Sequence, residues 1–310
     1  MSDELLQRPV WTRAGRYRVS SELFMDVVFT GRCSCSCPWC IARTREYARE
    51  DREAWQRAVE DAFRVFNIRS VIILGGEATE DPDFFGKLDF LSRAMEGRGV
   101  NKLILTTNGI SLRDKAFLRR LLNTRIDAVN LSRMHYSQMR NDRIFGAATL
   151  NRDEIAELYG TLKRAGKTLR LNVNVWRGNL DTPEEMESFT ETFAGLCDAV
   201  KFTPLMKTDM FDTVGQVTRA AEALAIPERE IAELWNSFLA RNRMTGSASQ
   251  VLGFVEYAEA NAFGQRVILK YAQVEDKYDR ETEIPTLKLY PNGCLSNEWS
   301  FRKDIREGLM

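Results

Sequence analysis

The sequence predicts an α/β fold in which parallel strands form a barrel or an open sheet. Between residues 23 and 206, short apolar runs alternate six times with amphipathic helical segments, as in β-α units joined by right-handed crossovers. The chain has 310 residues, of which 44% are hydrophobic, so it is long enough to bury a large core. We therefore expect residues 23–206 to form the main structural unit.

The expected strands are β-branched and aromatic runs that end at a glycine or a polar residue. Residues 23–30 form the first strand, which stops at Gly31. In residues 168–176, Asn172 and Asn174 alternate with apolar residues, so one face is polar, which favours a pocket lining over exposure to solvent. The remaining strands are expected over residues 70–77, 101–109, 126–136 and 199–206.

The expected helices repeat apolar residues every three or four positions. Residues 51–66 place Trp55, Val59 and Phe63 at this spacing and carry acidic residues near the start. Further helices are expected over residues 81–96, 111–123, 151–165 and 182–197, the last with Pro183 in its first turn.

Beyond residue 206 the alternation of strand and helix ends. Residues 227–244 predict a helix, and two apolar runs flank Pro291, Asn292 and Gly293 as in a β-hairpin. We expect a lead-in over residues 1–22, the core over 23–206 and a C-terminal extension over 207–310 that packs on the core.

Charge and hydropathy exclude several classes of partner. Lys plus Arg and Asp plus Glu number 44 each, so no overall field attracts nucleic acid or an anionic membrane. The first residues carry acids and lack the apolar stretch of a signal peptide. No later segment approaches the roughly 18 uncharged apolar residues of a membrane span. We expect a cytoplasmic protein that binds neither nucleic acid nor membrane.

Four of the six cysteines lie within eight residues, at Cys33, Cys35, Cys37 and Cys40. In an intracellular protein of this size, such a group indicates a metal site or redox chemistry, because disulfide frameworks belong to small secreted domains. Zinc modules usually add a second pair of ligands, which neither the downstream sequence nor the lone His135 supplies. A structural zinc site or a plain redox loop remains the alternative.

Cys33, Cys37 and Cys40 give the spacing C-x3-C-x2-C, which supplies three thiolates for a cubane of four irons. One iron is then left open for a chelating cosubstrate. This spacing, in the loop after the first strand, resembles the signature of the radical SAM superfamily. The second strand ends in Gly75, Gly76 and Glu77, similar to the GGE motif of that family, although Ala78 replaces its usual proline.

The resemblance covers residues 23–206 and implies a partial (β/α)6 TIM-type barrel of parallel strands, covered by an α+β C-terminal extension. It also implies two cofactors, a [4Fe-4S] cluster bound by Cys33, Cys37 and Cys40, and S-adenosylmethionine. Cys35 does not fit the spacing and is left unligated. The residues expected at the cosubstrate are Trp39, Gly75, Gly76, Glu77, Thr107, Asn108, Ser132, Arg133, Asn172, Asn174, Val200 and Phe202.

The implied reaction is reductive cleavage of S-adenosylmethionine to a 5′-deoxyadenosyl radical, which abstracts hydrogen from a small polar metabolite or natural-product intermediate. Epimerisation, dehydration, decarboxylation, rearrangement and dehydrogenation all remain open, so the enzyme is a lyase, an isomerase or an oxidoreductase. An electron donor such as flavodoxin or ferredoxin is the expected protein partner. The extension holds only one cysteine, Cys294, so we expect a single cluster and treat Cys294 as a candidate hydrogen-atom donor.

Two other readings stay open. The chain could modify a peptide or a protein, including activation of a glycyl radical in a partner. It could instead be a non-catalytic scaffold that binds the cluster and S-adenosylmethionine without turnover.

Overall fold

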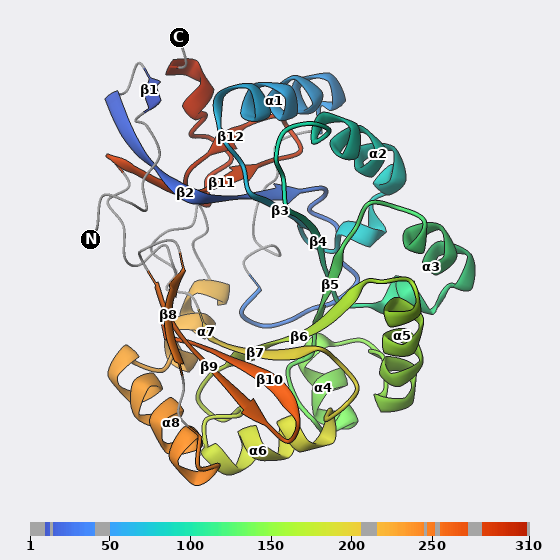
Figure 1. Ribbon diagram of the computed structural model, residues 1–310, viewed down its shortest axis with the longest axis vertical. Coiled ribbons are helices and arrows are strands. Elements are labelled where there is room, and N and C mark those ends of the chain that lie inside the picture. Colours follow the sequence, from blue (N-terminus) through green and yellow to red (C-terminus); the bar gives the residue numbers. More distant parts are fainter. Residues whose placement is uncertain are drawn as a thin grey trace.

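The computed structural model describes residues 10–12, 15–40, 50–205, 216–244, 247–251, 255–271 and 281–308. Its strands form a strongly curved sheet with helices along the outside (Figure 1). The six strands expected between residues 23 and 206 are present, and each is parallel to the next. They are β2 (Gly15–Val28), β3 (Ser70–Leu74), β4 (Lys102–Thr107), β5 (Ala128–Ser132), β6 (Thr168–Val175) and β7 (Ala199–Pro204). The predicted α/β fold with a partial TIM-type barrel is confirmed.

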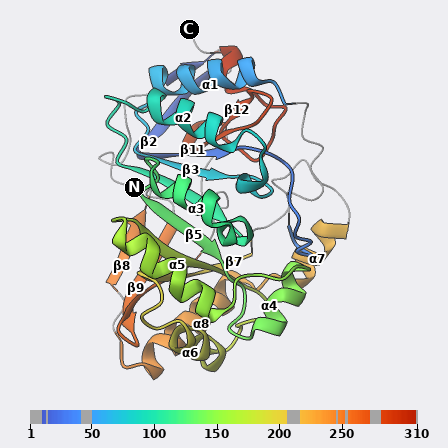
Figure 2. The ribbon, with the colours of Figure 1, turned by 90° about the vertical axis from the view of Figure 1, so that its right-hand side faces the viewer.

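Helices cross between successive strands on the outer face. Several begin at side-chain caps: the Asp51 carboxylate accepts a hydrogen bond from the Ala54 amide, and Asn151 and Glu154 form a capping box. The helices expected from the sequence are α1 (Arg52–Val65), α2 (Phe84–Ala94), α3 (Lys115–Leu122), α5 (Arg152–Arg164) and α6 (Pro183–Thr192). Figure 2 shows α1, α2, α3 and α5 along one side of the sheet. None of the helices within the described ranges is both long and apolar enough to cross a membrane.

Several elements differ from the sequence prediction, among them the unpredicted strands over residues 247–251, 255–262 and 265–270. β2 begins at Gly15 rather than at residue 23, so the end of the predicted lead-in is part of the first core strand. Helix α4 (Gln138–Phe145) was not predicted, because its short polar sequence lacks an apolar helical repeat; it ends at Gly146, whose φ of 66° is left-handed. Helix α7 (Gln216–Leu224) was also missed.

The C-terminal extension continues the barrel sheet at both edges. At one edge, β10 (Gln265–Lys270) is parallel to β7 and is followed outward by β9 (Val255–Ala262) and β8 (Ser247–Val251). At the other edge, β11 (Glu283–Leu289) is parallel to β2 and antiparallel to the short β12 (Leu295–Ser296). Helix α8 (Glu228–Arg241) packs against α6. Strands from this region therefore help to enclose the interior of the barrel.

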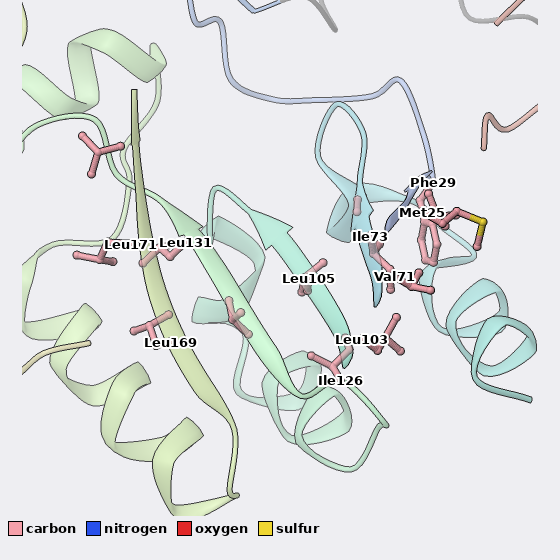
Figure 3. Packing of buried hydrophobic residues seen from close by; sticks show 14 of the residues in the cluster. Met25, Phe29, Val71, Ile73, Leu103, Leu105, Ile126, Leu131, Leu169 and Leu171 are labelled. Carbon is pink, nitrogen blue, oxygen red and sulfur yellow. The ribbon is translucent and has the colours of Figure 1, made fainter. Parts of the chain in front are cut away.

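The main hydrophobic core lies between the sheet and the helices. Val71 and Ile73 of β3 and Leu103 and Leu105 of β4 have no exposed surface, and they lie on the same side of their strands (Figure 3). Since side chains alternate along a strand, the residues between them face the barrel interior. This second face is polar on several strands, and it carries the residues discussed below.

The sequence analysis expected Phe202 of β7 at the cosubstrate, whereas its side chain lies in the hydrophobic core. A substitution can test this core assignment. The ring of Phe202 lies 5.7 Å from that of Phe189 and 6.3 Å from that of Trp235, and it has no exposed surface. We expect Phe202→Ala to lower the free energy of unfolding by about 3–5 kcal/mol, because it leaves a cavity in the core. Chemical denaturation measures the change.

The control is Met139→Ala, which truncates a side chain that is 69% exposed and should change stability by less than about 0.5 kcal/mol. A Phe202→Ala protein of unchanged stability would contradict the core assignment.

Candidate active site

A cavity of about 280 Å³ opens at the carboxyl ends of the barrel strands. Ligands of β/α barrels bind at this end. Figure 1 shows the segment after β2, drawn in blue, lying inside the curve of the strands. The cavity is lined by Cys33, Cys35, Cys37, Trp39, Cys40, Leu74, Gly75, Gly76, Glu77, Thr106, Thr107, Asn108, Ser132, Met134, Phe145, Asn174, Pro204, Leu205 and Ala221.

Most of the residues predicted from the sequence come together in this wall. The three expected cluster ligands are present, together with Trp39 from the same loop. Strands β3 to β6 contribute their ends. The predicted cosubstrate residues in the wall are Gly75, Gly76, Glu77, Thr107, Asn108, Ser132 and Asn174.

The two glycines after β3 make room for the cysteine loop, residues 31–40. A Cβ atom on Gly76 would lie 2.2 Å from the carbonyl oxygen of Arg32, and one on Gly75 would lie 2.4 Å from that of Thr30. The Gly76 amide donates to Thr30 O at 2.8 Å, and the Glu77 amide donates to Arg32 O at 2.6 Å. The two glycines therefore let the backbone of the cysteine loop approach the end of β3 closely.

Further contacts fix the cysteine loop at its middle. The carboxylate of Glu80 accepts hydrogen bonds from the amide and the hydroxyl of Ser34, at 2.9 and 2.6 Å. The Ser36 amide donates to Phe145 O at 2.6 Å, at the end of α4. A Cβ atom on Gly146 would lie 2.0 Å from Ser36 Oγ, so this glycine also allows a close approach. The loop is therefore held from both β3 and α4.

A buried ion pair supports the start of the cysteine loop. Lys87 Nζ lies 2.6 Å from the Asp81 carboxylate and donates to Phe29 O at 2.7 Å. Both side chains are at most 5% exposed, so each buried charge is stabilised by the opposite charge of the other. The pair fixes the chain where it leaves β2.

The thiols of the loop differ in their surroundings. Cys33, Cys37 and Cys40 are half-buried, whereas Cys35 is 6% exposed and accepts a hydrogen bond from Asn108 Nδ2 at 3.3 Å. The pKa of the Cys33 thiol is raised, first by its hydrogen bond with Cys35 and then by burial. Metal ions that bind such thiols displace their protons.

The three half-buried cysteines suit a multinuclear cluster. They line one wall of the cavity and hold no disulfide. Within the described residues, no three His, Cys, Asp or Glu side chains converge on one point as the ligands of a single metal ion do. A cubane binds each thiolate at a separate iron, so its ligands need no common centre.

Glu77 joins the ends of β3 and β4. Its Oε1 accepts hydrogen bonds from the hydroxyls of Thr79 and Thr107, at 2.6 and 2.7 Å, and its Oε2 accepts from the Asn108 amide at 2.6 Å. Burial raises the pKa of this carboxyl, and these donors oppose the shift. Thr107 and Asn108, predicted as cosubstrate contacts, thus also position Glu77.

Part of the cavity wall is apolar. Trp39 packs on Trp176 at the end of β6, with ring centroids 4.0 Å apart, and both rings are nearly buried. Met134, Phe145 and Ala221 belong to the same cluster and line the cavity. The sequence analysis anticipated only Trp39 of this cluster. It missed Phe145 and Ala221 because they lie on α4 and α7, which it did not identify.

Several predicted site residues lie outside the cavity. The guanidinium of Arg133 is buried beneath β5 and donates to the carbonyl oxygens of His135 and Leu150 at 2.8 and 2.7 Å. Burial lowers the pKa of Arg133 to about 10. Val200 and Phe202 are fully buried in the core between sheet and helices. These three side chains hold the fold together around the cavity.

Asn172 and Cys294 also lie away from the cavity wall. Asn172 Oδ1 accepts a hydrogen bond from Arg170 Nε at 3.0 Å, deeper along β6. Cys294 is 5% exposed in a cluster with Tyr290, Trp299 and Phe301. The structure therefore places the candidate hydrogen-atom donor behind other side chains rather than in the wall of the cavity.

Gly76→Ala tests the contact between β3 and the cysteine loop. Because the new Cβ would overlap the carbonyl of Arg32, the loop must shift, and we expect the iron bound after anaerobic reconstitution to fall by at least about half, as cluster binding depends on ligand placement. Iron and sulfide analysis measures the loss. Gly160→Ala, where the nearest atom is the flexible end of Arg164 at 3.4 Å, serves as the control. Full iron content in Gly76→Ala would contradict the proposed role of the glycine.

Comparison with solved structures shows the same fold in other proteins. SuiB from Streptococcus suis bound to S-adenosylmethionine has 16% identity and a TM-score of 0.57, covering 91% of this chain and 64% of that chain. The anSMEcpe protein with bound AdoMet has 14% identity and a TM-score of 0.51, covering 71% of this chain and 60% of that chain. This chain thus spans less than two thirds of either protein. At such identities the likeness concerns the fold alone.

Sequence comparison identifies the family. A search of curated proteins returned no match. The model of the radical SAM superfamily matches residues 27–193, which is more than half of the chain and includes the cysteine loop and the end of β3. The cofactors that this family implies are a [4Fe-4S] cluster and S-adenosylmethionine, and the half-buried thiols beside the cavity fit them. This chain belongs to the radical SAM superfamily.

Proposed function

We propose that this chain is a single-cluster radical SAM enzyme that acts on a small polar metabolite or natural-product intermediate. The observation that carries the proposal is that the cysteine loop and the Gly75–Glu77 segment line one cavity. Cys33, Cys37 and Cys40 would bind the cluster, and residues 23–206 would form the catalytic core beside an extension over 207–310. When bound, the cofactors supply a 5′-deoxyadenosyl radical that abstracts hydrogen from carbon.

Glu77 is suited to the ammonium group of the cosubstrate. A carboxylate accepts about four hydrogen bonds, and Oε2 of Glu77 receives one from the described residues, that of the Asn108 amide. An ammonium group at Oε2 would lower the pKa of this carboxyl again by adding a positive charge. Thr79 and Thr107 hold the carboxylate in place while it binds.

The apolar wall would keep water from the reacting carbon. Trp39, Met134 and Phe145 line the cavity and are less than 9% exposed. Side chains packed in this way leave little room for solvent, which protects reactive intermediates. Trp39 would also lie beside the adenine.

The class of reaction and the electron donor are further parts of the proposal. The polar side chains of Ser132 and Asn174 in the wall favour a polar substrate, which is consistent with lyase, isomerase or oxidoreductase chemistry. A reductant such as flavodoxin or ferredoxin would supply the electron.

A peptide substrate is the second candidate. SuiB has also been solved bound to its precursor peptide SuiA, and that structure has 16% identity and a TM-score of 0.56 to this chain. This similarity is one of fold, so it supports a peptide substrate by fold analogy alone.

Single substitutions of the loop cysteines test the assignment. We expect Cys33→Ala, Cys37→Ala and Cys40→Ala each to lose most of the iron and to form no 5′-deoxyadenosine with dithionite and S-adenosylmethionine under anaerobic conditions, because each removes one of three thiolate ligands. Iron analysis and chromatography of the nucleoside measure both effects.

Cys35→Ser is the matched control. Serine keeps an acceptor for Asn108 Nδ2, so the loop should stay in place, with iron content close to that of the parent protein. Loss of about a quarter of the iron or more, as for a lost ligand, would show that Cys35 binds the cluster. A parent protein that binds the cluster but forms no 5′-deoxyadenosine would instead favour a non-catalytic scaffold.

A further inference from the structure

The cysteine loop is a thin wall between the cavity and solvent. Alternate residues of the loop line the cavity, namely Cys33, Cys35, Cys37 and Trp39. The residues between them are exposed, namely Arg32, Ser34, Ser36 and Pro38. Because the side chains alternate in this way, a single stretch of backbone separates the expected cluster ligands Cys33 and Cys37 from the outside of the protein.

The outer side of the loop is open to close approach by another protein. Three of its four exposed residues are serine or proline, whose side chains are short. The cavity walls formed by β3 to β6 belong instead to a sheet that has helices along its outside (Figure 1). A partner at the loop would therefore lie closer to the cluster ligands than a partner docked on those helices.

Helix α4 extends this outer surface. The Ser36 amide donates to Phe145 O, and a Cβ atom on Gly146 would point at Ser36 Oγ, 2.0 Å away. Figure 2 shows the blue segment after β2 reaching α4. Met139 and Arg143 precede Gly146 at helical spacing, so they lie on the same face of α4. The Met139 side chain is 69% exposed, and that of Arg143 is also exposed.

Two exposed arginines lie on this surface, Arg32 on the loop and Arg143 on α4. Neither guanidinium makes a hydrogen bond or an ion pair with another residue in the part of the chain that the structure describes. The carboxylate of Glu80, which also reaches the loop, is bound to the amide and the hydroxyl of Ser34. The two guanidinium groups can therefore pair with carboxylates of an approaching protein, which steers association and sets its orientation.

We propose that a small acidic protein that delivers single electrons docks on this surface. The docking surface consists of Arg32, Ser34, Ser36, Pro38, Met139 and Arg143. There the donor would lose one electron and the bound cluster would gain it, with no bond made or broken. Electron transfer slows steeply with distance, so the thin wall of the cysteine loop is the favourable place for it.

This inference rests on the proposed function and adds to it the place where the electron donor binds. Arginine and methionine are enriched in protein interfaces, and the donor complexes of electron transfer are small and short-lived. A surface of two arginines, one exposed methionine and a short loop suits such a complex. The sequence analysis considered Arg143 only as a possible substrate contact and did not consider Arg32 or Met139.

The rate of 5′-deoxyadenosine formation by the reconstituted full-length chain tests the proposal. It is measured with reduced flavodoxin, with reduced ferredoxin and, separately, with dithionite, which is small and needs no docking. We expect Arg32→Glu and Arg143→Glu each to lower the rate with the more effective protein donor at least about fivefold relative to the rate with dithionite, since each reverses a charge of the docking surface. The ionic strength is kept low, because salt screens exposed charges.

Binding of the oxidised donor provides a second readout that requires no turnover. Isothermal titration calorimetry measures its affinity for the parent protein and for the two charge-reversal variants. We expect each variant to weaken binding by at least about fivefold at low ionic strength and by less as salt is added, because the lost contacts lie at the surface.

Two control variants sharpen the result. Arg143→Lys keeps the positive charge, and Arg93→Glu reverses an exposed charge at the end of α2 that leads toward the start of β4. Both should keep the parent ratio of the rates with protein donor and with dithionite. A parent-like ratio in both Arg32→Glu and Arg143→Glu would overturn the inference. An equal loss of rate with dithionite would also overturn it, since the substitutions would then act on the site itself.

The same measurements separate this inference from the proposed function. Cleavage of S-adenosylmethionine with dithionite but with neither protein donor would reject the docking surface alone. An oxidised donor that binds the parent protein but binds both charge-reversal variants more weakly, in a chain that forms no 5′-deoxyadenosine with dithionite, would reject the enzymatic function alone.

Discussion

The contact between the cysteine loop and the end of β3 organises the site. Gly75 and Gly76 let the loop backbone approach within hydrogen-bond distance, and the amides of Gly76 and Glu77 donate to it. Glu77 then binds the end of β4 through Thr107 and Asn108. These hydrogen bonds together join the cysteine loop, which follows β2, to the ends of β3 and β4. The sheet would therefore fix the position of a cluster bound by the loop.

The two faces of the sheet serve different purposes. The face toward the helices is apolar and supplies the stability of the fold, as Val71, Leu105 and Phe202 illustrate. The interior face carries polar and charged side chains, such as those of Asp26, Asn172 and Lys201, each of which lies between buried apolar residues of its strand. Local departures from the rules of good packing are expected where a protein binds its ligands.

The sequence predicted the parallel core well, because six units of strand and helix have strong periodicity. The strand-end residues that line the cavity were expected from the resemblance to the radical SAM superfamily, which the motif spacing of Cys33, Cys37 and Cys40 carries. The sequence did not predict α4, whose polar sequence has no apolar repeat, and so missed Phe145 and the contact of Gly146 with Ser36. Those contacts join segments that are distant in the sequence. The spacing of residues along the chain does not predict such contacts.

β7 shows how the alternation of side chains along a strand separates core residues from residues of the barrel interior. The family resemblance implies that backbone atoms of residues 200–202 meet the adenine; the side chains of Val200 and Phe202 face the helices, and the residue between them faces the barrel. Once one apolar residue of a barrel strand is assigned to the core, alternation assigns its neighbours to the interior. Applied to β2, β6 and β7, this step assigns Asp26, Arg170 and Lys201 to the interior face of the barrel. A lysine flanked by large apolar residues in a barrel strand therefore belongs to the interior face and does not interrupt the core.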